Sequence, residues 1–218
     1  MTGETNQLLP VFINGAGLRA LVVGGGEVAV GKVLQLRQCQ FDVSVVSPQL
    51  NARLRALQKQ GEVLWHRRPY RQGDLAEVDL VICATDDPKL QGEISEAARA
   101  RHLLVNVVDA PHSCTFYMGA VASRGNIKIA VSTNGQSPAL ARRIRDELDG
   151  AIAPEYEALL EILGEIRPQV QERLHESFAQ RRKFFEAVLA TDCLELLRRG
   201  ERLIASKRVA ELLDEAAD

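Results

Sequence analysis

The sequence has few cysteines and no closely spaced pair of them. The four cysteines, Cys39, Cys83, Cys114 and Cys193, are 44, 31 and 79 residues apart. A zinc ribbon or a thioredoxin-like redox site needs two cysteines close in sequence, and a disulfide framework needs a dense set. The four histidines are scattered and form no metal-binding motif. We therefore predict no metal site, no redox pair and no disulfide scaffold.

The sequence is also poor in aromatic residues, net charge and long apolar runs. Aromatic residues make up 5%, and 27 basic against 29 acidic residues leave a net charge of -2. Nucleic-acid binders use stacking rings or excess positive charge, so no nucleic-acid partner is expected. No apolar run approaches the roughly 18 residues of a membrane span, and the first residues lack a signal peptide's pattern. We expect no membrane partner and a soluble protein in the reducing cytoplasm.

What the sequence does have is an alternation of apolar runs and helical patterns. Strands are predicted at residues 18–23, 42–46, 63–66, 78–84 and 103–108, with helices at 28–36, 51–60 and 88–101. The run at 78–84 is almost entirely apolar, as in a strand that is buried on both faces. Such alternation gives right-handed crossovers and a parallel sheet with helices on both faces, so the predicted class is α/β.

The pattern changes after residue 109. Two strand-like runs at 115–123 and 127–133, joined by Arg124-Gly125-Asn126, predict a hairpin. Ser137 and Pro138 fit the N-cap and first position of a helix at 139–148. From residue 154 onward only helical patterns occur, interrupted near Gly164, Pro168 and Gly200. The predicted domains are a Rossmann-like domain at 1–113, a small α+β unit at 114–150 and a helical C-terminal domain at 151–218.

A glycine-rich loop directly follows the first predicted strand. The run Gly24-Gly25-Gly26-Glu27-Val28-Ala29 matches the dinucleotide-binding pattern G-x-G-x-x-A. Gly24 allows a tight turn, Gly26 lets the backbone approach a pyrophosphate, and Ala29 permits close packing of helix on strand. The helix N-terminus then supplies amides for the phosphates. These six residues are predicted to bind the cofactor, and the alternative is a glycine-rich turn without a ligand.

The loops after the second and fourth strands complete the predicted cofactor site. The second strand ends in Ser47-Pro48, where an acidic residue would bind the ribose hydroxyls of NAD, so the sequence does not choose NAD over NADP. Ser47 could bond the ribose, or Ser47-Pro48 could be a simple turn. Thr85 follows the fourth strand and is placed near the cofactor. Asp86 and Asp87, which precede Pro88, are as well suited to helix capping as to catalysis.

Asp109 is the candidate acid–base residue. It follows an apolar strand at the carboxyl end, where chemistry in this fold usually takes place. Burial at such a position raises the pKa of a carboxyl group and makes it a usable base. An aspartate before Ala110-Pro111 is equally suited to forming a turn, and the residue pattern leaves both alternatives open.

Taken together, the segments resemble the precorrin-2 dehydrogenase/sirohydrochlorin ferrochelatase family, which includes the N-terminal half of fused sirohaem synthases. The resemblance extends over almost the whole chain in the right order. It rests on segments 9–12, 24–29 with Lys32, 84–87, 106–111, 129–133, 135–141 and 181–185. The runs Asn106-Val107-Val108-Asp109-Ala110-Pro111 and Ser137-Pro138-Ala139-Leu140-Ala141-Arg142 are far more specific than the glycine loop.

The resemblance implies NAD-dependent oxidation of precorrin-2 to sirohydrochlorin in sirohaem biosynthesis, with Asp109 as the catalytic general base. Some relatives then insert ferrous iron, so Fe2+ is at most a further substrate. The family forms homodimers, which makes the unit at 114–150 a dimerisation unit. The predicted substrate-binding residues are Asn106, Thr133, Ser137 and Arg142. At the position of Thr133 some fused synthases carry a serine that can be phosphorylated, so that regulation is not expected here.

Two clusters of basic residues are candidates for binding the carboxylates of the substrate. The tetrapyrrole carries many carboxylates, which arginine binds in bidentate fashion, and Arg142–Arg145 and Arg181–Lys183 are basic clusters. A solvated helix face is the alternative for each of them. The competing function is a non-catalytic NAD-sensing module whose helical tail binds a partner, and such a module would not need Asp109.

Overall fold

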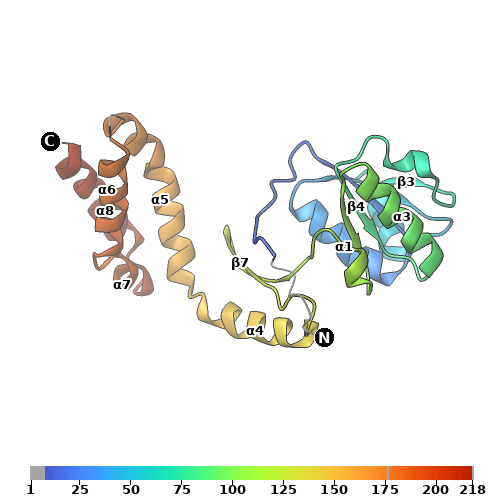
Figure 1. Cartoon of the computed structure of the whole chain (residues 1–218). Helices are drawn as coiled ribbons and strands as arrows, with labels where there is room; N and C mark the ends of the chain where they lie inside the picture. The colour runs from blue at the N-terminus through green and yellow to red at the C-terminus, as the bar shows by residue number, and fades with distance from the viewer. Residues whose placement is uncertain (1–7, 176, 218) are drawn as a thin grey trace, which may run out of the picture. The chain divides into compact units, whose positions relative to one another are not determined.

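The computed structural model describes residues 8–175 and 177–217. The chain divides into two compact units, with the boundary between Met118 and Gly119. Buried hydrophobic residues form separate clusters in the two units. Figure 1 shows the elements of both units.

The first unit is a five-stranded parallel sheet with helices. Its elements are β1 (Arg19–Val23), α1 (Glu27–Gln38), β2 (Asp42–Val46), α2 (Ala52–Lys59), β3 (Leu64–His66), η1 (Gln72–Leu75), β4 (Leu80–Cys83), α3 (Pro88–Ala100), β5 (Leu104–Val107) and η2 (Pro111–Ser113). The strand order is β3-β2-β1-β4-β5, and every neighbouring pair is parallel. The predicted α/β class with a Rossmann-like parallel sheet is confirmed.

Side chains that alternate along the strands build two cores on opposite faces of the sheet. Val22 and Val45 point to the side of α1 and α2, where Val33 and Leu54 are fully buried. Leu21 and its neighbours in β4 and β5 point to the other side, where α3 supplies Ile94 and Ala98. Figure 1 shows α1 and α3 on the two faces. Aliphatic side chains buried on both faces explain why the strands read as nearly continuous apolar runs.

The link between β3 and β4 contains only the short 3-10 helix η1 within the described chain. No full helix therefore covers β2 and β3 on the α3 side of the sheet, and Leu64 stays 62% exposed. Two strands are shorter than predicted. β4 ends at Cys83 and not at residue 84, and β5 ends at Val107 and not at residue 108.

The second unit begins with an antiparallel hairpin and a helix. Strands β6 (Ala120–Arg124) and β7 (Ile127–Val131) pair in the predicted hairpin, and α4 (Pro138–Ala151) packs against both. The predicted extension of the first strand back to Thr115 is wrong, because residues 115–119 are not in a strand. The predicted cap is confirmed, since the Ser137 hydroxyl accepts a hydrogen bond from the Leu140 N–H at 3.2 Å.

Helices α5 (Pro154–Arg173), α6 (Phe178–Leu189), α7 (Cys193–Arg198) and α8 (Arg202–Ala217) form the rest of the second unit. The predicted breaks near Gly164 and Pro168 are wrong, because α5 continues through both. Leu159, Ile166 and Val170 are buried on either side of these residues, and this packing outweighs the lost hydrogen bond of Pro168. The predicted break at Gly200 is confirmed by its φ of 80° between α7 and α8.

The apolar residues at the start of α5 are divided between core and surface. Leu159 is buried and Leu163 packs against the core, whereas Leu160 is 38% exposed. Leu159 and Leu163 therefore belong to the core of the second unit.

Asp87 is the N-cap of α3 and provides a direct stability test. Its Oδ1 accepts hydrogen bonds from the N–H groups of Lys89 at 3.0 Å and Leu90 at 3.3 Å. Replacing Asp87 by alanine is expected to lower the free energy of unfolding by about 0.5–2 kcal/mol. Chemical denaturation measures this change. Asp86→Ala is the control, because Asp86 lies just outside the helix, and an equal loss in both variants would contradict the capping role.

Candidate functional site

Gly24 directly follows β1 and has a conformation that only glycine adopts easily. Its φ is 119°, and a Cβ here would lie 2.1 Å from the Ala84 carbonyl oxygen. The Gly24 N–H donates to the Val46 carbonyl at 3.0 Å, so the loop is anchored to the carboxyl end of β2. The turn thus lies between the ends of β2 and β4, the position of a nucleotide crevice in this fold.

Gly25 and Gly26 have different surroundings. A Cβ on Gly25 would lie 2.1 Å from the Gln49 carbonyl oxygen, so this glycine allows the loop to pack on the segment after β2. A Cβ on Gly26 would meet nothing within 4 Å, and no side chain caps the helix that Gly26 begins. The first turn of α1 therefore has no side-chain cap and has room at Gly26, which fits a pyrophosphate. Ala29 is fully buried against the sheet, as predicted for the third position of the motif.

The side chains of Glu27 and Val28 add little to an anion site. The Glu27 carboxylate accepts a hydrogen bond from Asn51 Nδ2 at 2.7 Å, which ties α1 to the cap of α2. Val28 is 53% exposed. Any contribution of Glu27 and Val28 to cofactor binding is therefore expected from their backbone N–H groups and not from their side chains. Both N–H groups lie in the first turn of α1.

Ser47 and Pro48 form a turn after β2. The Ser47 hydroxyl donates to the Gln49 carbonyl at 2.7 Å, and the Ser47 carbonyl accepts from Trp65 Nε1 at 2.9 Å. Ser47 is buried and Pro48 is exposed. Of the two alternatives for Ser47, the local turn is the one that the structure contains, and ribose binding by this residue stays a prediction.

The loop after β4 borders the glycine turn. Thr85 is half-buried, its carbonyl accepts from Gln91 Nε2 at 2.7 Å, and a Cβ on Gly24 would lie 3.4 Å from its nitrogen. Burial raises the pKa of the Cys83 thiol to about 11, so this thiol is protonated at neutral pH and is no nucleophile.

Asp109 lies at the carboxyl end of β5 in a left-handed turn. Its φ is 59°, which is uncommon for a residue other than glycine and most readily adopted by Asn and Asp. Asp109 is exposed, so the expectation of a buried carboxyl group is wrong. The turn projects Asp109 beyond the last buried residue of β5, and the carboxylate is open to a ligand. A strained residue at the crevice edge is a feature that functional sites often show.

Lys32 is a charged neighbour of Asp109 to which the residue pattern gave no role. Burial lowers the pKa of the Lys32 ammonium, while the neighbouring Cys114 and Asp109 side chains raise it by less. Lys32 lies on α1, half-buried, and carries a charge opposite to that of Asp109. A lysine beside the buried positions of an amphipathic helix is the sequence signal that could have identified it.

Asn106 lies within β5 and is 7% exposed. Its Nδ2 donates to the Phe116 carbonyl at 3.0 Å, so the side chain fixes the segment after η2 along the sheet edge. The Asn106 side chain thus stabilises the packing of this segment on β5. Substrate binding by Asn106 stays a prediction.

The other predicted substrate residues belong to the second unit. Thr133 Oγ1 donates to the Ser137 carbonyl at 3.0 Å and accepts from the Ser137 N–H at 3.1 Å, which closes the loop before α4. Arg142 is exposed on α4. Arg143 and Arg145, by contrast, are ion-paired with Glu147 at 2.8 Å and Asp146 at 2.6 Å. Thr133, Ser137 and Arg142 therefore share one end of α4, with Arg142 open to solvent.

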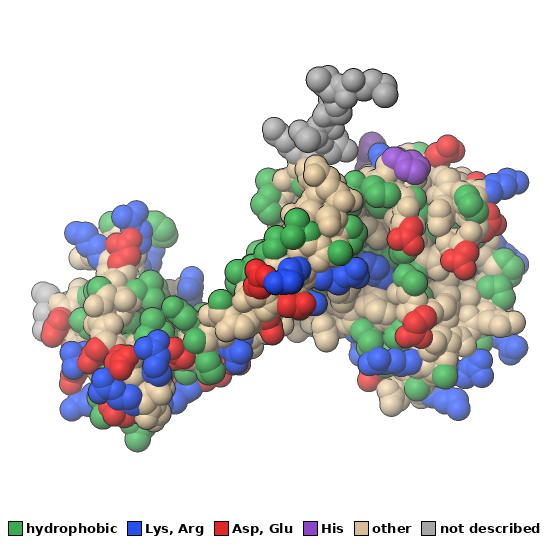
Figure 2. Space-filling view, turned by 90° about the horizontal axis from the view of Figure 1, so that it is seen from below, with side chains coloured by type: hydrophobic (Ala, Val, Ile, Leu, Met, Phe, Trp, Pro, Cys, Tyr) green, Lys and Arg blue, Asp and Glu red, His purple; other side chains and the backbone are tan. Residues whose placement is uncertain are grey.

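The second basic cluster is largely engaged within its own helices. Arg181 donates to the carbonyls of Leu174 at 2.7 Å and His175 at 2.9 Å, and Arg182 pairs with Glu186 at 3.0 Å. On the face of the helical part seen in Figure 2, basic and acidic side chains are interspersed. The surface shown has no large area of one sign, which agrees with the small net charge.

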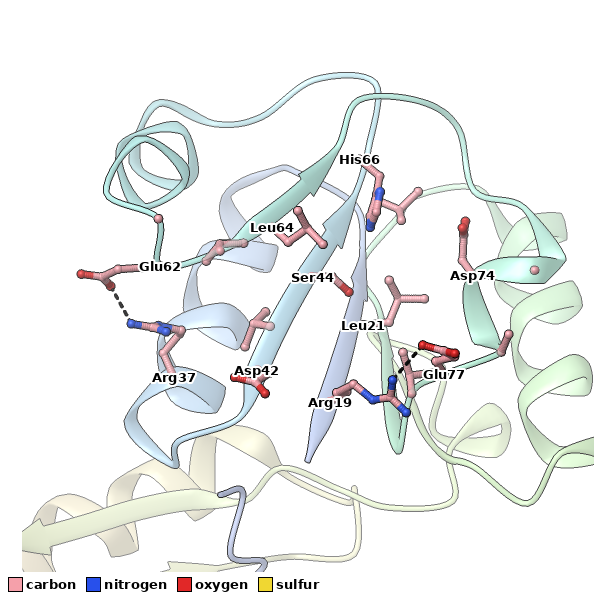
Figure 3. Close-up of a pocket in the computed structure, with 17 residues that line it drawn as sticks. Arg19, Leu21, Arg37, Asp42, Ser44, Glu62, Leu64, His66, Asp74 and Glu77 are labelled. Carbon is pink, nitrogen blue, oxygen red and sulfur yellow. Dashed lines mark hydrogen bonds and ion pairs between the residues drawn. The ribbon is translucent and has the colours of Figure 1, made fainter. Parts of the chain in front are cut away.

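A cavity of about 510 Å³ lies on the sheet face that the short β3–β4 link leaves uncovered. Figure 3 shows its side chains, with the ion pairs Arg19–Glu77 and Arg37–Glu62 on two sides of Leu21 and Ser44. The residues predicted to bind the cofactor, all of them described, are not among its lining residues. This cavity is thus separate from the glycine turn, which lies at the carboxyl ends of β1 and β4.

Residues 8–175 and 177–217 contain neither a helix that could span a membrane nor a cluster of three possible metal ligands. No helix there is long and apolar enough to cross a membrane. Within the same residues, no group of three or more His, Cys, Asp or Glu could hold a metal ion.

The strand order, the glycine turn and the uncapped helix define a dinucleotide-binding protein of the Rossmann type. Three family models match the chain in succession. They are described as "Putative NAD(P)-binding" at residues 11–120, "Sirohaem biosynthesis protein central" at 124–151 and "Sirohaem synthase dimerisation region" at 155–213. The chain belongs to the putative NAD(P)-binding family, and the predicted resemblance to the sirohaem synthase family is confirmed.

Individual relatives agree with this assignment. A siroheme synthase of Pseudomonas entomophila is 40% identical over 210 residues, which are 95% of this chain and 45% of the relative. Siroheme synthase 1 of Pectobacterium atrosepticum is 37% identical over 193 residues, 88% of this chain and 40% of the relative. The chain thus spans less than half the length of these relatives. The solved structure of SirC, a precorrin-2 dehydrogenase, has the same fold, with a TM-score of 0.72, 23% identity, and coverage of 95% of this chain and 100% of that one.

Proposed function

We propose that the chain oxidises precorrin-2 to sirohydrochlorin with NAD as hydride acceptor, in sirohaem biosynthesis, with Asp109 as general base. The observation that carries the proposal is the Asp109 carboxylate, which is accessible in a left-handed turn at the same sheet edge as the glycine loop. The names of the relatives, siroheme synthase and precorrin-2 dehydrogenase, support the substrate class.

The reaction removes two hydrogen atoms from the macrocycle, one as a hydride and one as a proton. A bound nicotinamide would accept the hydride. The amides at the start of α1 would hold the pyrophosphate, and Gly26 leaves them open space. Thr85, next to the Gly24 turn, would border the cofactor. Asp109 would take up the proton at its carboxylate, and the half-buried Lys32 is a charged neighbour of that carboxylate.

Substrate binding, assembly and location are parts of the same proposal. Arg142 is the candidate partner for a substrate carboxylate, with Asn106, Thr133 and Ser137 as further substrate contacts. The proposed domains are 1–113, 114–150 and 151–218, and the ends of the three family matches lie close to them. The match to a dimerisation region supports a homodimer. All four cysteines are free, which suits the reducing cytoplasm.

The test is an anaerobic assay of the purified chain with precorrin-2 and NAD. We expect NADH and sirohydrochlorin to form in equal amounts, followed by their absorbance spectra, and less product with NADP. Binding of NAD without any oxidation would contradict the proposal and favour the non-catalytic NAD sensor.

A second arm of the assay supplies sirohydrochlorin and Fe2+ without NAD. Ferrous iron is a substrate in this arm, and formation of sirohaem faster than in the protein-free control would add the ferrochelatase activity that the resemblance raises. A rate equal to the control would leave a dehydrogenase alone.

A further inference from the structure

The turn that carries Asp109 is held by the side chain of Cys114, which follows η2 along the chain. β5 is the last strand of the sheet, so among the residues that the structure describes its outer edge has no strand partner. The segment after η2 runs along this edge, where Thr115 donates its N–H to the Val105 carbonyl at 2.8 Å and Thr115 Oγ1 accepts from the Val105 N–H at 2.8 Å. Side-chain atoms thus replace part of a missing strand.

Cys114 contacts the backbone on both sides of Asp109. Its Sγ accepts from the Val107 N–H at 3.2 Å and lies 3.3 Å from the Val107 carbonyl oxygen and 3.4 Å from the Ala110 carbonyl oxygen. Asn106 Nδ2 approaches the same sulfur at 3.7 Å. The thiol therefore bonds the backbone two residues before Asp109 and one residue after it.

The state of the thiol is compatible with these contacts. Burial raises the pKa of Cys114, and its hydrogen bond from Val107 and the charges of Arg99 and Lys32 lower it by less. The thiol consequently keeps its proton at neutral pH and can donate to one of the two carbonyls. A second restraint is the hydrogen bond from the Ala110 N–H to the Val107 carbonyl at 3.3 Å, which closes the turn.

We propose that Cys114 is a positioning residue that holds residues 107–110 so that Asp109 stays in its left-handed conformation with its carboxylate exposed. The inference rests on the proposed function of Asp109. Without the thiol, the Val107 N–H loses its acceptor and Asp109 can relax to a negative φ, which turns the carboxylate away from its position. Misplacement of a reacting group by about 1 Å can cost on the order of 10²-fold in rate.

The experiment compares Cys114→Ala, Cys114→Ser and Cys193→Ala in the full chain. Cys114→Ala is expected to lower kcat about 10- to 100-fold, with KM for both substrates unchanged. Cys114→Ser restores a donor and an acceptor, so it should recover most of the lost rate. Cys193 is the control, because it is another free cysteine whose thiol approaches a backbone carbonyl, that of Ala205 at 3.9 Å, but it lies in the second unit. Its replacement should lower stability without changing kcat.

Amide hydrogen exchange gives a readout that needs no activity. The Val107 and Ala110 amides should exchange faster in Cys114→Ala than in the wild type, and at the wild-type rate in Cys193→Ala. Wild-type kcat and wild-type exchange in Cys114→Ala would overturn the inference, as would an equal loss of kcat in Cys193→Ala. If the wild-type chain does not oxidise precorrin-2, the proposed function fails, while the exchange rates still decide whether Cys114 holds the turn.

Discussion

Replacing Asp109 by asparagine is expected to abolish most of the oxidation of precorrin-2 while leaving NAD binding intact. Asparagine also adopts the left-handed conformation readily, so the turn with its φ of 59° is retained and only the ionisable group is lost. General base catalysis contributes about 10²–10⁴-fold, and we expect kcat to fall by that range. Steady-state kinetics give the fall in kcat, and titration with NAD gives the affinity.

Asp42→Asn is the matched control for this substitution. Asp42 is another exposed aspartate of the first unit, but it begins β2 and so lies at the opposite end of the strands from Asp109. The control should keep the wild-type kcat. Wild-type turnover in Asp109→Asn would remove Asp109 from the proposed chemistry and leave it as a turn residue.

Gly24→Ala is expected to destabilise the first unit and prevent NAD binding. The new Cβ would lie 2.1 Å from the Ala84 carbonyl oxygen, and the φ of 119° is strained for any residue with a side chain. Backbone strain and overpacking each cost about 1–3 kcal/mol, a large part of the marginal stability of a domain. Thermal unfolding followed by circular dichroism measures the loss.

Two other glycines separate folding from binding. In Gly26→Ala the added Cβ has no atom within 4 Å, so the protein should still fold. Because alanine is a poorer N-cap than glycine, the free energy of unfolding should fall by less than about 1 kcal/mol. Its methyl group occupies the space in front of the amides, and NAD affinity should fall. Gly31 lies within α1, and a Cβ there would also have no atom within 4 Å. Gly31→Ala should therefore stabilise the helix by about 0.5–1 kcal/mol and leave NAD affinity unchanged. Equal NAD affinity in Gly26→Ala and the wild type would contradict the pyrophosphate site.

The parallel sheet was predictable because each of its strands is a local apolar run that ends at a turn signal. The glycine loop was predictable because Gly24, Gly26 and Ala29 have a fixed short spacing directly after a strand. Helix ends at Asp87 and Ser137 followed from capping chemistry, which is also local. The continuity of α5 through Pro168 was not predictable, because it depends on the tertiary packing of Ile166 and Val170.

The surroundings of Asp109 were beyond the sequence for a different reason. Its accessibility depends on a left-handed turn, and that turn depends on contacts with Cys114 several residues later. The proximity of Lys32 depends on how α1 packs on the sheet. The sequence pattern identifies Asp109 as a residue type suited to acid–base chemistry. Its distances to Lys32 and Cys114 depend on the tertiary fold and cannot be derived from that pattern.

The short link between β3 and β4 has a consequence for spectroscopy. β3 is a three-residue edge strand with one uncovered face, so it should open at a lower free energy than the central strands. It contains Trp65, the single tryptophan of the chain, whose indole N–H bonds the Ser47 carbonyl next to the glycine loop. Tryptophan emission therefore reports local fraying at the rim of the nucleotide crevice, and it changes before the sheet as a whole unfolds.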